Sequence, residues 1–224
     1  MIELKILLAC EESQTVCAAF RAKGHEAYSC DIQSCSGNHP EWHIKDDVLL
    51  LLKSHYFFTQ DFQLHHVYEW DLIIAFPPCT FLSNAGIWCF NVDKLGEKAI
   101  QRHKDRCKAA HFFMQFVNAP CKRIAIENPV GIMSKWYRQP DQIIHHYYFT
   151  TPEDTENFVK KRTCLWLKNL PVLQYDQPEK EPGANWCESR PHTKDRQKIR
   201  SKTFPVIAEA MAEQWGNLKE GDTQ

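Results

Sequence analysis

The sequence lacks the features that mark membrane-spanning, secreted or strongly basic proteins. Its 224 residues contain no apolar run near the roughly 20 residues that a membrane-spanning helix needs, and even the Leu-rich run at 48–52 stops at Lys53. The N-terminus has no basic segment followed by a small-residue cleavage site, so we expect no signal peptide. There are no internal repeats and no low-complexity tracts. Because the net charge is −1, contact with a polyanion would have to come from a local basic patch.

The ten cysteines do not form the framework of a disulfide-rich secreted protein. Four of them, Cys10, Cys30, Cys79 and Cys164, lie in or beside segments that we expect to be strands, where free cysteine is common. We therefore expect reduced thiols and a cytoplasmic protein of a bacterium or a phage-infected cell. Two groups of possible zinc ligands lack zinc-finger spacing, so no metal site is expected. These groups are Cys30, Cys35, His39 and His43, and the pair Cys187 and His192.

Apolar and amphipathic segments alternate along the chain, which predicts an α/β fold with a mostly parallel sheet. We expect strands at residues 5–10, 26–30, 44–48, 71–76 and 123–126, and later strands, possibly antiparallel, at 147–149 and 163–167. We expect helices at 14–23, 93–117 and 205–215, the first with Ser13 as its N-cap and Gly24 as its stop. The segments 55–70 and 169–202 lack periodicity and read as excursions from the core.

Two short motifs span the fourth and fifth expected strands and the residues directly after them. Residues 71–79 read Asp-Leu-Ile-Ile-Ala-Phe-Pro-Pro-Cys, and residues 123–129 read Arg-Ile-Ala-Ile-Glu-Asn-Pro. Ligands of open α/β sheets bind at the carboxyl ends of the strands. The sequence therefore predicts a site where one loop offers a thiol and the next offers a carboxylate with an amide.

In this order, Pro78-Cys79 and Glu127-Asn128 resemble the motifs of DNA cytosine-C5 methyltransferases, specifically their small, divergent phage and bacterial members. The run 160–163 stands where the family has an Arg-x-Arg element, and residues 203–210 resemble its terminal helix. The resemblance spans about residues 4–216. It implies a Rossmann-like class I methyltransferase sheet with helices on both faces. The catalytic core would be residues 1–168, followed by a very short target-recognition excursion at 169–202 and a returning helix at 203–224.

The resemblance assigns roles to four residues. Cys79 would be the nucleophile that adds to carbon 6 of cytosine, which activates carbon 5 for attack on a methyl sulfonium. Glu127 would hold ring N3 and the exocyclic amine. Asn128 would order the Cys79 loop through backbone hydrogen bonds. Arg162 would hold Glu127 or the pyrimidine carbonyl.

The implied cofactor is S-adenosylmethionine. Asp31 ends the second strand, where an acid commonly binds ribose hydroxyls, and Asp47 ends the third and could reach the adenine amine. Helix capping is the competing interpretation for both. Glu11 and Ser13 in the first turn are weaker candidates, and Pro77 would also face the cofactor. The first turn departs from the family, because residues 9–13 contain no glycine to let the backbone approach a ligand.

DNA is the implied partner, and the local basic patch it needs is present near the C-terminus. Basic residues fall at every second position and would share one face of an extended chain, which suits a row of phosphates, although a solvated loop is equally compatible. They are Lys194, Arg196, Lys198, Arg200 and Lys202.

Three other functions stay open at this point. An amino-methyltransferase is disfavoured because Phe76 and Cys79 stand where its Asp/Asn/Ser and aromatic residues would be. A catalytically silent DNA-binding scaffold fits the missing glycines but not the presence of both Cys79 and Glu127. A pyrimidine-modifying enzyme that uses another one-carbon donor is permitted by the altered first turn.

Overall fold

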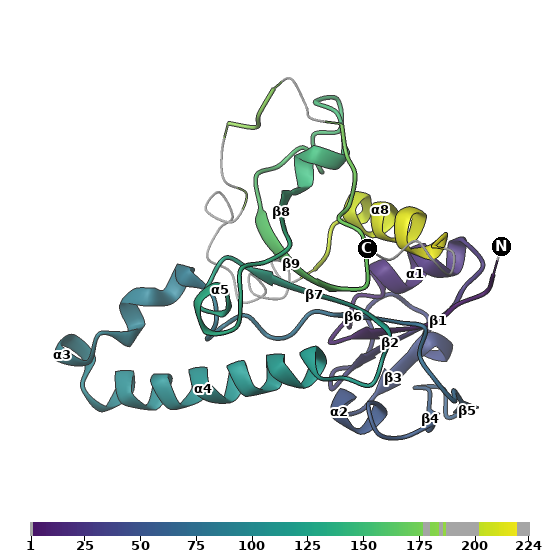
Figure 1. Cartoon of the computed structure of the whole chain (residues 1–224), viewed down its shortest axis with the longest axis horizontal. Coiled ribbons are helices and arrows are strands. Elements are labelled where there is room, and N and C mark those ends of the chain that lie inside the picture. Colours follow the sequence, from purple (N-terminus) through teal and green to yellow (C-terminus); the bar gives the residue numbers. More distant parts are fainter. Residues whose placement is uncertain (1, 177–179, 184–185, 187–201, 219–224) are drawn as a thin grey trace.

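The computed structural model describes residues 2–176, 180–183, 186 and 202–218, which contain a seven-stranded sheet and a separate two-stranded hairpin. The order of the strands in the larger sheet is β3-β2-β1-β6-β7-β9-β8 (Figure 1). These strands are β1 (Lys5–Ala9), β2 (Glu26–Asp31), β3 (His43–Lys45), β6 (Leu72–Ala75), β7 (Arg123–Pro129), β8 (Gln142–His145) and β9 (Arg162–Lys168).

The parallel part of this sheet has the strand order of a Rossmann-like fold. Strands β3, β2, β1, β6 and β7 are parallel, and β9 is antiparallel to both β7 and β8. The chain adds β2 and β3 on one side of β1 and then returns to add β6 on the other. In open α/β sheets such a reversal marks the edge where ligands bind, and here it falls at the carboxyl ends of β1 and β6. The predicted α/β fold with a mostly parallel sheet is confirmed.

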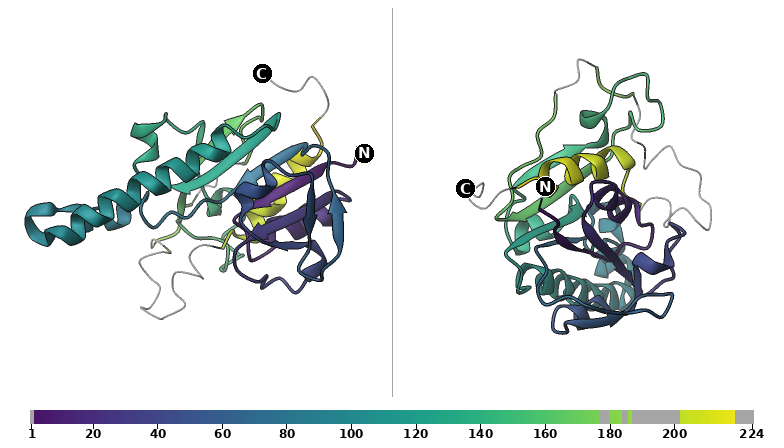
Figure 2. Two further views of the ribbon diagram at one scale, coloured as in Figure 1. Left: turned by 90° about the horizontal axis from the view of Figure 1, so that it is seen from below. Right: turned by 90° about the vertical axis from the view of Figure 1, so that its right-hand side faces the viewer.

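Helices cover both faces of the sheet, because successive residues of a buried strand point to opposite sides. One face packs against α1 (Thr15–Ala22) and α8 (Pro205–Gly216), which lie side by side in Figures 1 and 2. Its core includes Ile6 and Leu8 of β1 with Phe20 and Trp215 of the helices. The prediction of a C-terminal helix with an apolar face is confirmed.

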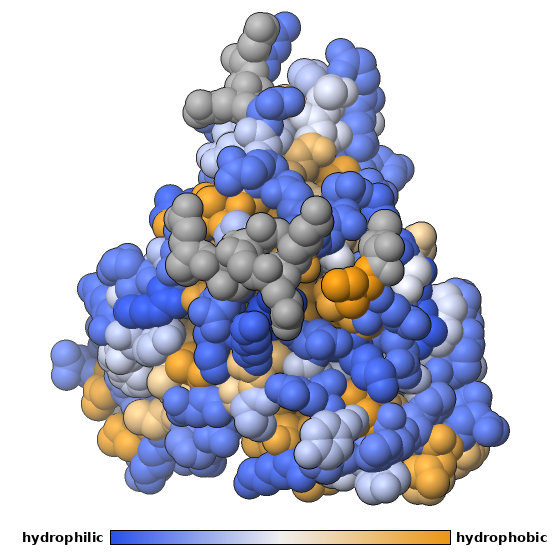
Figure 3. All heavy atoms as spheres, turned by 45° about the vertical axis from the view of Figure 1, so that its right-hand side comes forward, coloured by the Kyte–Doolittle hydropathy of each residue, from blue (hydrophilic) through white to orange (hydrophobic). Residues whose placement is uncertain are grey.

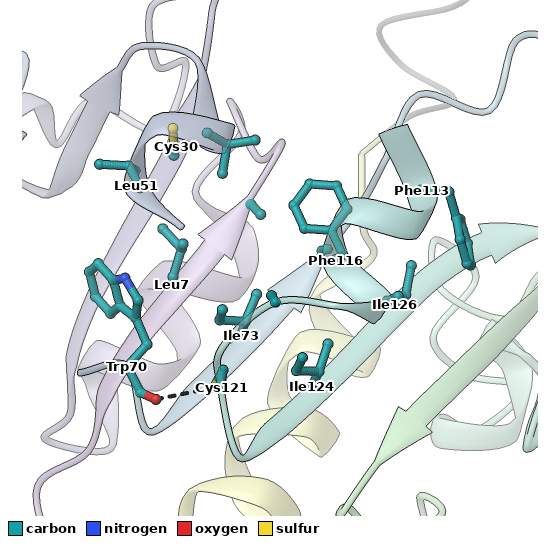
Figure 4. Packing of buried hydrophobic residues seen from close by; sticks show 14 of the residues in the cluster. Leu7, Cys30, Leu51, Trp70, Ile73, Phe113, Phe116, Cys121, Ile124 and Ile126 are labelled. Atoms are coloured by element: carbon teal, nitrogen blue, oxygen red, sulfur yellow. Dashed lines mark hydrogen bonds between the residues drawn. The ribbon is translucent and has the colours of Figure 1, made fainter. Parts of the chain in front are cut away.

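The other face packs against α2 (Val48–Leu51) and the second half of α4 (Glu97–Val117). Figure 4 shows Phe113 and Phe116 of α4 beside the β7 residues Ile124 and Ile126. The same figure shows the thiol of Cys121 donating a hydrogen bond to the Trp70 carbonyl, at 3.0 Å.

The first half of α4 projects away from the sheet and carries two shorter helices at its tip (Figure 2, left). These are the 3₁₀ helix η2 (Asn84–Phe90) and α3 (Val92–Leu95). The predicted single helix at 93–117 is therefore wrong near its start. Gly96, with φ 53° and ψ −130°, turns the backbone between α3 and α4.

Two expected strands also differ from the structure. Residues 147–149 are not a strand but belong to the 3₁₀ helix η3 (His146–Phe149), and the strand is the preceding β8. In η3 the aromatic rings pack on one another, with the Tyr147 and Tyr148 centroids 4.8 Å apart. The third strand ends at Lys45 rather than at residue 48, because the carboxylate of Asp47 accepts the backbone N–H of Leu49 and starts α2.

The segment 55–70 is an insertion rich in aromatic residues, and it contains the antiparallel hairpin of β4 (Tyr56–Phe58) and β5 (Leu64–His66). The other short helices with bounds in the described part of the chain are η1 (Pro40–Trp42) and α5 (Met133–Trp136). Among the described residues, no helix combines the length and apolar character needed to cross a bilayer.

Candidate functional site

The two sequence motifs emerge side by side at the carboxyl edge of the sheet. Strands β6 and β7 are parallel neighbours, with Ala75 opposite Ile126 in the register. The loop that begins at Phe76 therefore starts beside Glu127, and Cys79 follows three residues later. The Cys79 side chain is partly exposed. A thiol and a carboxyl group are thus supplied to one edge by adjacent strands, as the sequence predicts.

A side-chain hydrogen bond and a β-bridge clamp the Cys79 loop onto the end of β7 and the loop that follows it. The Asn128 amide donates a hydrogen bond to the Pro77 carbonyl at 2.7 Å, and the Asn128 side chain is buried. Further along, Ser83 forms a β-bridge with Gly131, where a Cβ atom would lie only 2.0 Å from the Leu82 oxygen. A side chain at this glycine would push the loops apart. The expected role of Asn128 in ordering this loop agrees with this geometry.

Two arginines of α4, which the sequence analysis did not identify, also hold this loop. Arg102 donates to the carbonyl of Thr80 at 3.2 Å, and Arg106 donates to the carbonyl of Phe81 at 3.0 Å. The guanidinium of Arg106 also lies 3.1 Å from the centre of the Phe90 ring. The residues next to Cys79 are therefore fixed by α4. Nothing in the sequence signals these contacts, since the acceptors are backbone carbonyls about 20 residues away.

Glu127 lies in surroundings that favour its protonated form. Burial raises the pKa of the Glu127 carboxyl, while nearby Lys161 and a hydrogen bond from the Thr163 hydroxyl lower it, and the balance is an increase. Thr163 and Lys161 belong to one side of the β9 segment. Arg162 points to the opposite side, where it is opposite His145 in the register. The cation beside Glu127 is therefore Lys161, not the expected Arg162.

The turn after β1 is built without glycine and is closed by Glu11. Cys10 and Gln14 adopt left-handed backbone conformations, with φ of 62° and 61°. The buried Glu11 carboxylate accepts the backbone N–H groups of Val16 and Cys17 at 2.6 and 3.1 Å, so it caps α1. The expected N-cap Ser13 does not cap this helix, and its hydroxyl pairs with that of Thr15 at 3.1 Å.

Glu11 and Ser13 are thus engaged within the turn, and a carboxylate already fills the helix N-terminus where Rossmann-like proteins bind phosphate. Burial raises the pKa of Glu11 to about 7 despite these hydrogen bonds.

The acidic residues predicted to contact a cofactor gather around Cys10. Burial raises the pKa of the Cys10 thiol, and Asp31, Cys30 and Asp47 raise it further by their charge, which places both carboxylates near the end of β1. One Asp31 oxygen accepts the backbone N–H of Gln33 at 2.9 Å. The other makes no hydrogen bond among the described residues. Asp47 caps α2, and its side chain is exposed.

Pro77, the last residue expected near the cofactor, is buried, and its carbonyl is the acceptor of the Asn128 amide. Four of the five expected phosphate contacts, Lys194, Arg196, Lys198 and Arg200, lie outside the described residues. The fifth, Lys202, donates to the Ser36 hydroxyl at 3.2 Å in the loop that follows β2.

Nothing in the described part of the chain groups three or more possible metal ligands. No protein-family model matches this chain, and no curated protein matches its sequence.

Proposed function

We propose that this protein transfers a methyl group from S-adenosylmethionine to carbon 5 of cytosine in DNA. The observation that carries this proposal is the joined pair of loops at the ends of β6 and β7. They bring the partly exposed thiol of Cys79 and the protonatable carboxyl of Glu127 to one edge of the sheet, and the Asn128 amide ties them together.

The proposed reaction starts when the Cys79 thiolate adds to carbon 6 of cytosine, while the Glu127 carboxyl donates a proton or hydrogen bond to N3. The raised pKa supports this role, because it favours the protonated form of Glu127, which is the form that can donate to N3. When bound, S-adenosylmethionine supplies an electrophilic methyl group and leaves as its demethylated thioether. Loss of the carbon 5 proton to a base and departure of Cys79 then restore the ring. The target base must be unpaired or flipped out of its duplex.

The first turn fits a cofactor without phosphate better than a dinucleotide. The Glu11 carboxyl already accepts the Val16 and Cys17 N–H groups at the N-terminus of α1, so these donors are not available to a phosphate. Asp31 offers one carboxylate oxygen for a ribose hydroxyl, at the end of β2 where Rossmann-like proteins place this contact. Calorimetry should therefore show binding of S-adenosylmethionine that weakens in Asp31→Ala.

Covalent trapping tests the reaction directly. DNA that contains 5-fluorocytosine should form a stable adduct with the wild type and the cofactor, because the carbon 5 fluorine cannot be removed as a proton is. Cys79→Ala should form none. Cys107→Ala removes an exposed thiol on α4 and is the matched control, which should trap normally. Mass spectrometry of nucleosides from expressing cells should detect 5-methylcytosine.

The possible results separate the open alternatives. Methylation by Cys79→Ala would rule out the proposed nucleophile. DNA binding without trapping or methylation would favour a silent scaffold. A product with another one-carbon substituent at carbon 5 would show that the donor is different.

A further inference from the structure

A pocket lies at one edge of the sheet, beside the end of β3. It is open to solvent, has a volume of about 720 Å³ and is lined by the carboxyl end of β3, by α2 and by the β4–β5 hairpin. Its wall is fixed by Gln60, whose backbone N–H donates to the His43 carbonyl at 2.6 Å and whose side chain accepts the Cys35 N–H at 3.1 Å. Neither Cys79 nor Glu127 lines it.

The pocket presents aromatic side chains to solvent. Tyr56, Phe58 and Phe62 line it and are 62, 61 and 85% exposed. Figure 3 brings the side of the molecule that carries the hairpin toward the viewer and shows hydrophobic side chains at the surface in its lower part. The hairpin is anchored through its other face, where Phe57 is buried and packs on Tyr28 with ring centroids 5.0 Å apart. The outward aromatics are therefore not needed to fill the core.

Phe62 occupies a backbone position that disfavours its side chain. Its φ of 64° is in the left-handed region, at the tip of the hairpin loop, where its N–H donates to the Thr59 carbonyl at 2.8 Å. Glycine or asparagine adopts this conformation more easily than a bulky residue. The Phe62 backbone is strained and its ring is exposed. A contact between this ring and another molecule would account for both features.

Two lysines give the pocket a positive charge. Lys45 and Lys53 line it, against one carboxylate from Asp46, and neither lysine forms an ion pair within the described part of the chain. Exposed rings beside cations are the elements that bind single-stranded nucleic acid, by base stacking and phosphate contact. Strands β3 and β6 are separated by three strand spacings, or about 14 Å. One nucleic acid strand can therefore reach both the pocket and the Cys79 loop.

We propose that this pocket binds an unpaired base of a DNA strand, with Phe62 and Tyr56 as stacking surfaces and Lys45 and Lys53 as phosphate contacts. The identity of the strand rests on the proposed function, since it is the strand that would carry the target cytosine. The pocket would thereby add to the DNA contacts that the sequence predicts for the 169–202 segment.

Fluorescence anisotropy with a labelled single-stranded oligonucleotide of about 12 nucleotides tests this site. Phe62→Gly and Tyr56→Ala should each weaken binding about tenfold, as expected for one lost base stack. Phe62→Gly should at the same time keep or raise the melting temperature, because glycine suits the backbone. Tyr68→Ala is the matched control: Tyr68 is an exposed aromatic of the same insertion that does not line the pocket, and this variant should bind as the wild type does.

Neutralising both lysines with Lys45→Ala and Lys53→Ala should make the slope of log affinity against log salt less steep by about 1.4. The proposal is overturned if Phe62→Gly and Tyr56→Ala bind like the wild type, if a fully paired duplex without mismatches binds as tightly as the single strand, or if Tyr56→Ala instead converts a dimer to a monomer. Trapping by 5-fluorocytosine at saturating DNA is measured in parallel. Its absence in the wild type would refute the methyl transfer but leave the anisotropy comparison valid.

Discussion

Glu11 allows the cost of a buried carboxylate to be measured as a function of pH. Burial raises its pKa from 4.5 to about 7. Between these values the folded protein holds a proton that the unfolded chain has released, so stability falls as pH rises through this range. A difference of about 2.5 pKa units corresponds to roughly 3 kcal/mol. About 2 to 3 kcal/mol of this should be lost between pH 5 and pH 8.

Glu11→Gln removes this titration while keeping one oxygen to accept the Val16 N–H. Urea titrations followed by tryptophan fluorescence measure the free energy of unfolding of both proteins. The value for the variant minus that for the wild type should therefore increase as pH rises from 5 to 8. Burial lowers the pKa of His25, His43 and His146, and these groups change stability in the opposite direction, but they are common to both proteins and cancel in the difference. A difference that stays constant across this pH range would refute the reasoning.

Four further predictions test the clamp, the carboxyl group and the basic segment. Gly131→Ala should overpack the contact between the two loops, which should destabilise the protein by about 1 to 3 kcal/mol and abolish covalent trapping by 5-fluorocytosine. Gly183→Ala, where a Cβ meets nothing within 4 Å, should have neither effect. Asn128→Ala should cost about 1 to 3 kcal/mol because it leaves a buried carbonyl unpaired, and Asn118→Ala, which breaks an exposed amide–carbonyl bond, should cost less. Lys161→Met should raise the pKa of Glu127 and extend methyl transfer to higher pH, which a pH–rate profile measures against Lys160→Met. Neutralising Arg196, Lys198 and Arg200 together should weaken binding to all DNA sequences alike. It should also flatten the slope of log affinity against log salt concentration, which is expected near −2 to −3 in the wild type. An unchanged affinity would show that other residues contact the DNA.

The local sequence was sufficient to predict the elements whose signal is contained in one segment. Alternation of buried strands with amphipathic helices predicted the parallel sheet, and the apolar spacing of residues 205–215 predicted α8. The adjacency of the Cys79 and Glu127 loops also followed from sequence order, because consecutive parallel strands end at the same edge. Short elements were less predictable: the ring packing of residues 146–149 and the capping by Asp47 outweighed strand propensity.

Tertiary structure alone decided which groups meet at the site. Strand alternation turns Lys161 toward Glu127 and Arg162 away from it, and this depends on the register of β9 against β7. The capping role of Glu11 depends on how a turn without glycine folds back over α1. The arginine contacts to the Cys79 loop depend on where α4 lies. The sequence by itself determined the chemical groups and the edge of the sheet that carries them. Distances and pKa values required the packed structure, because they depend on neighbours and burial that no single segment encodes.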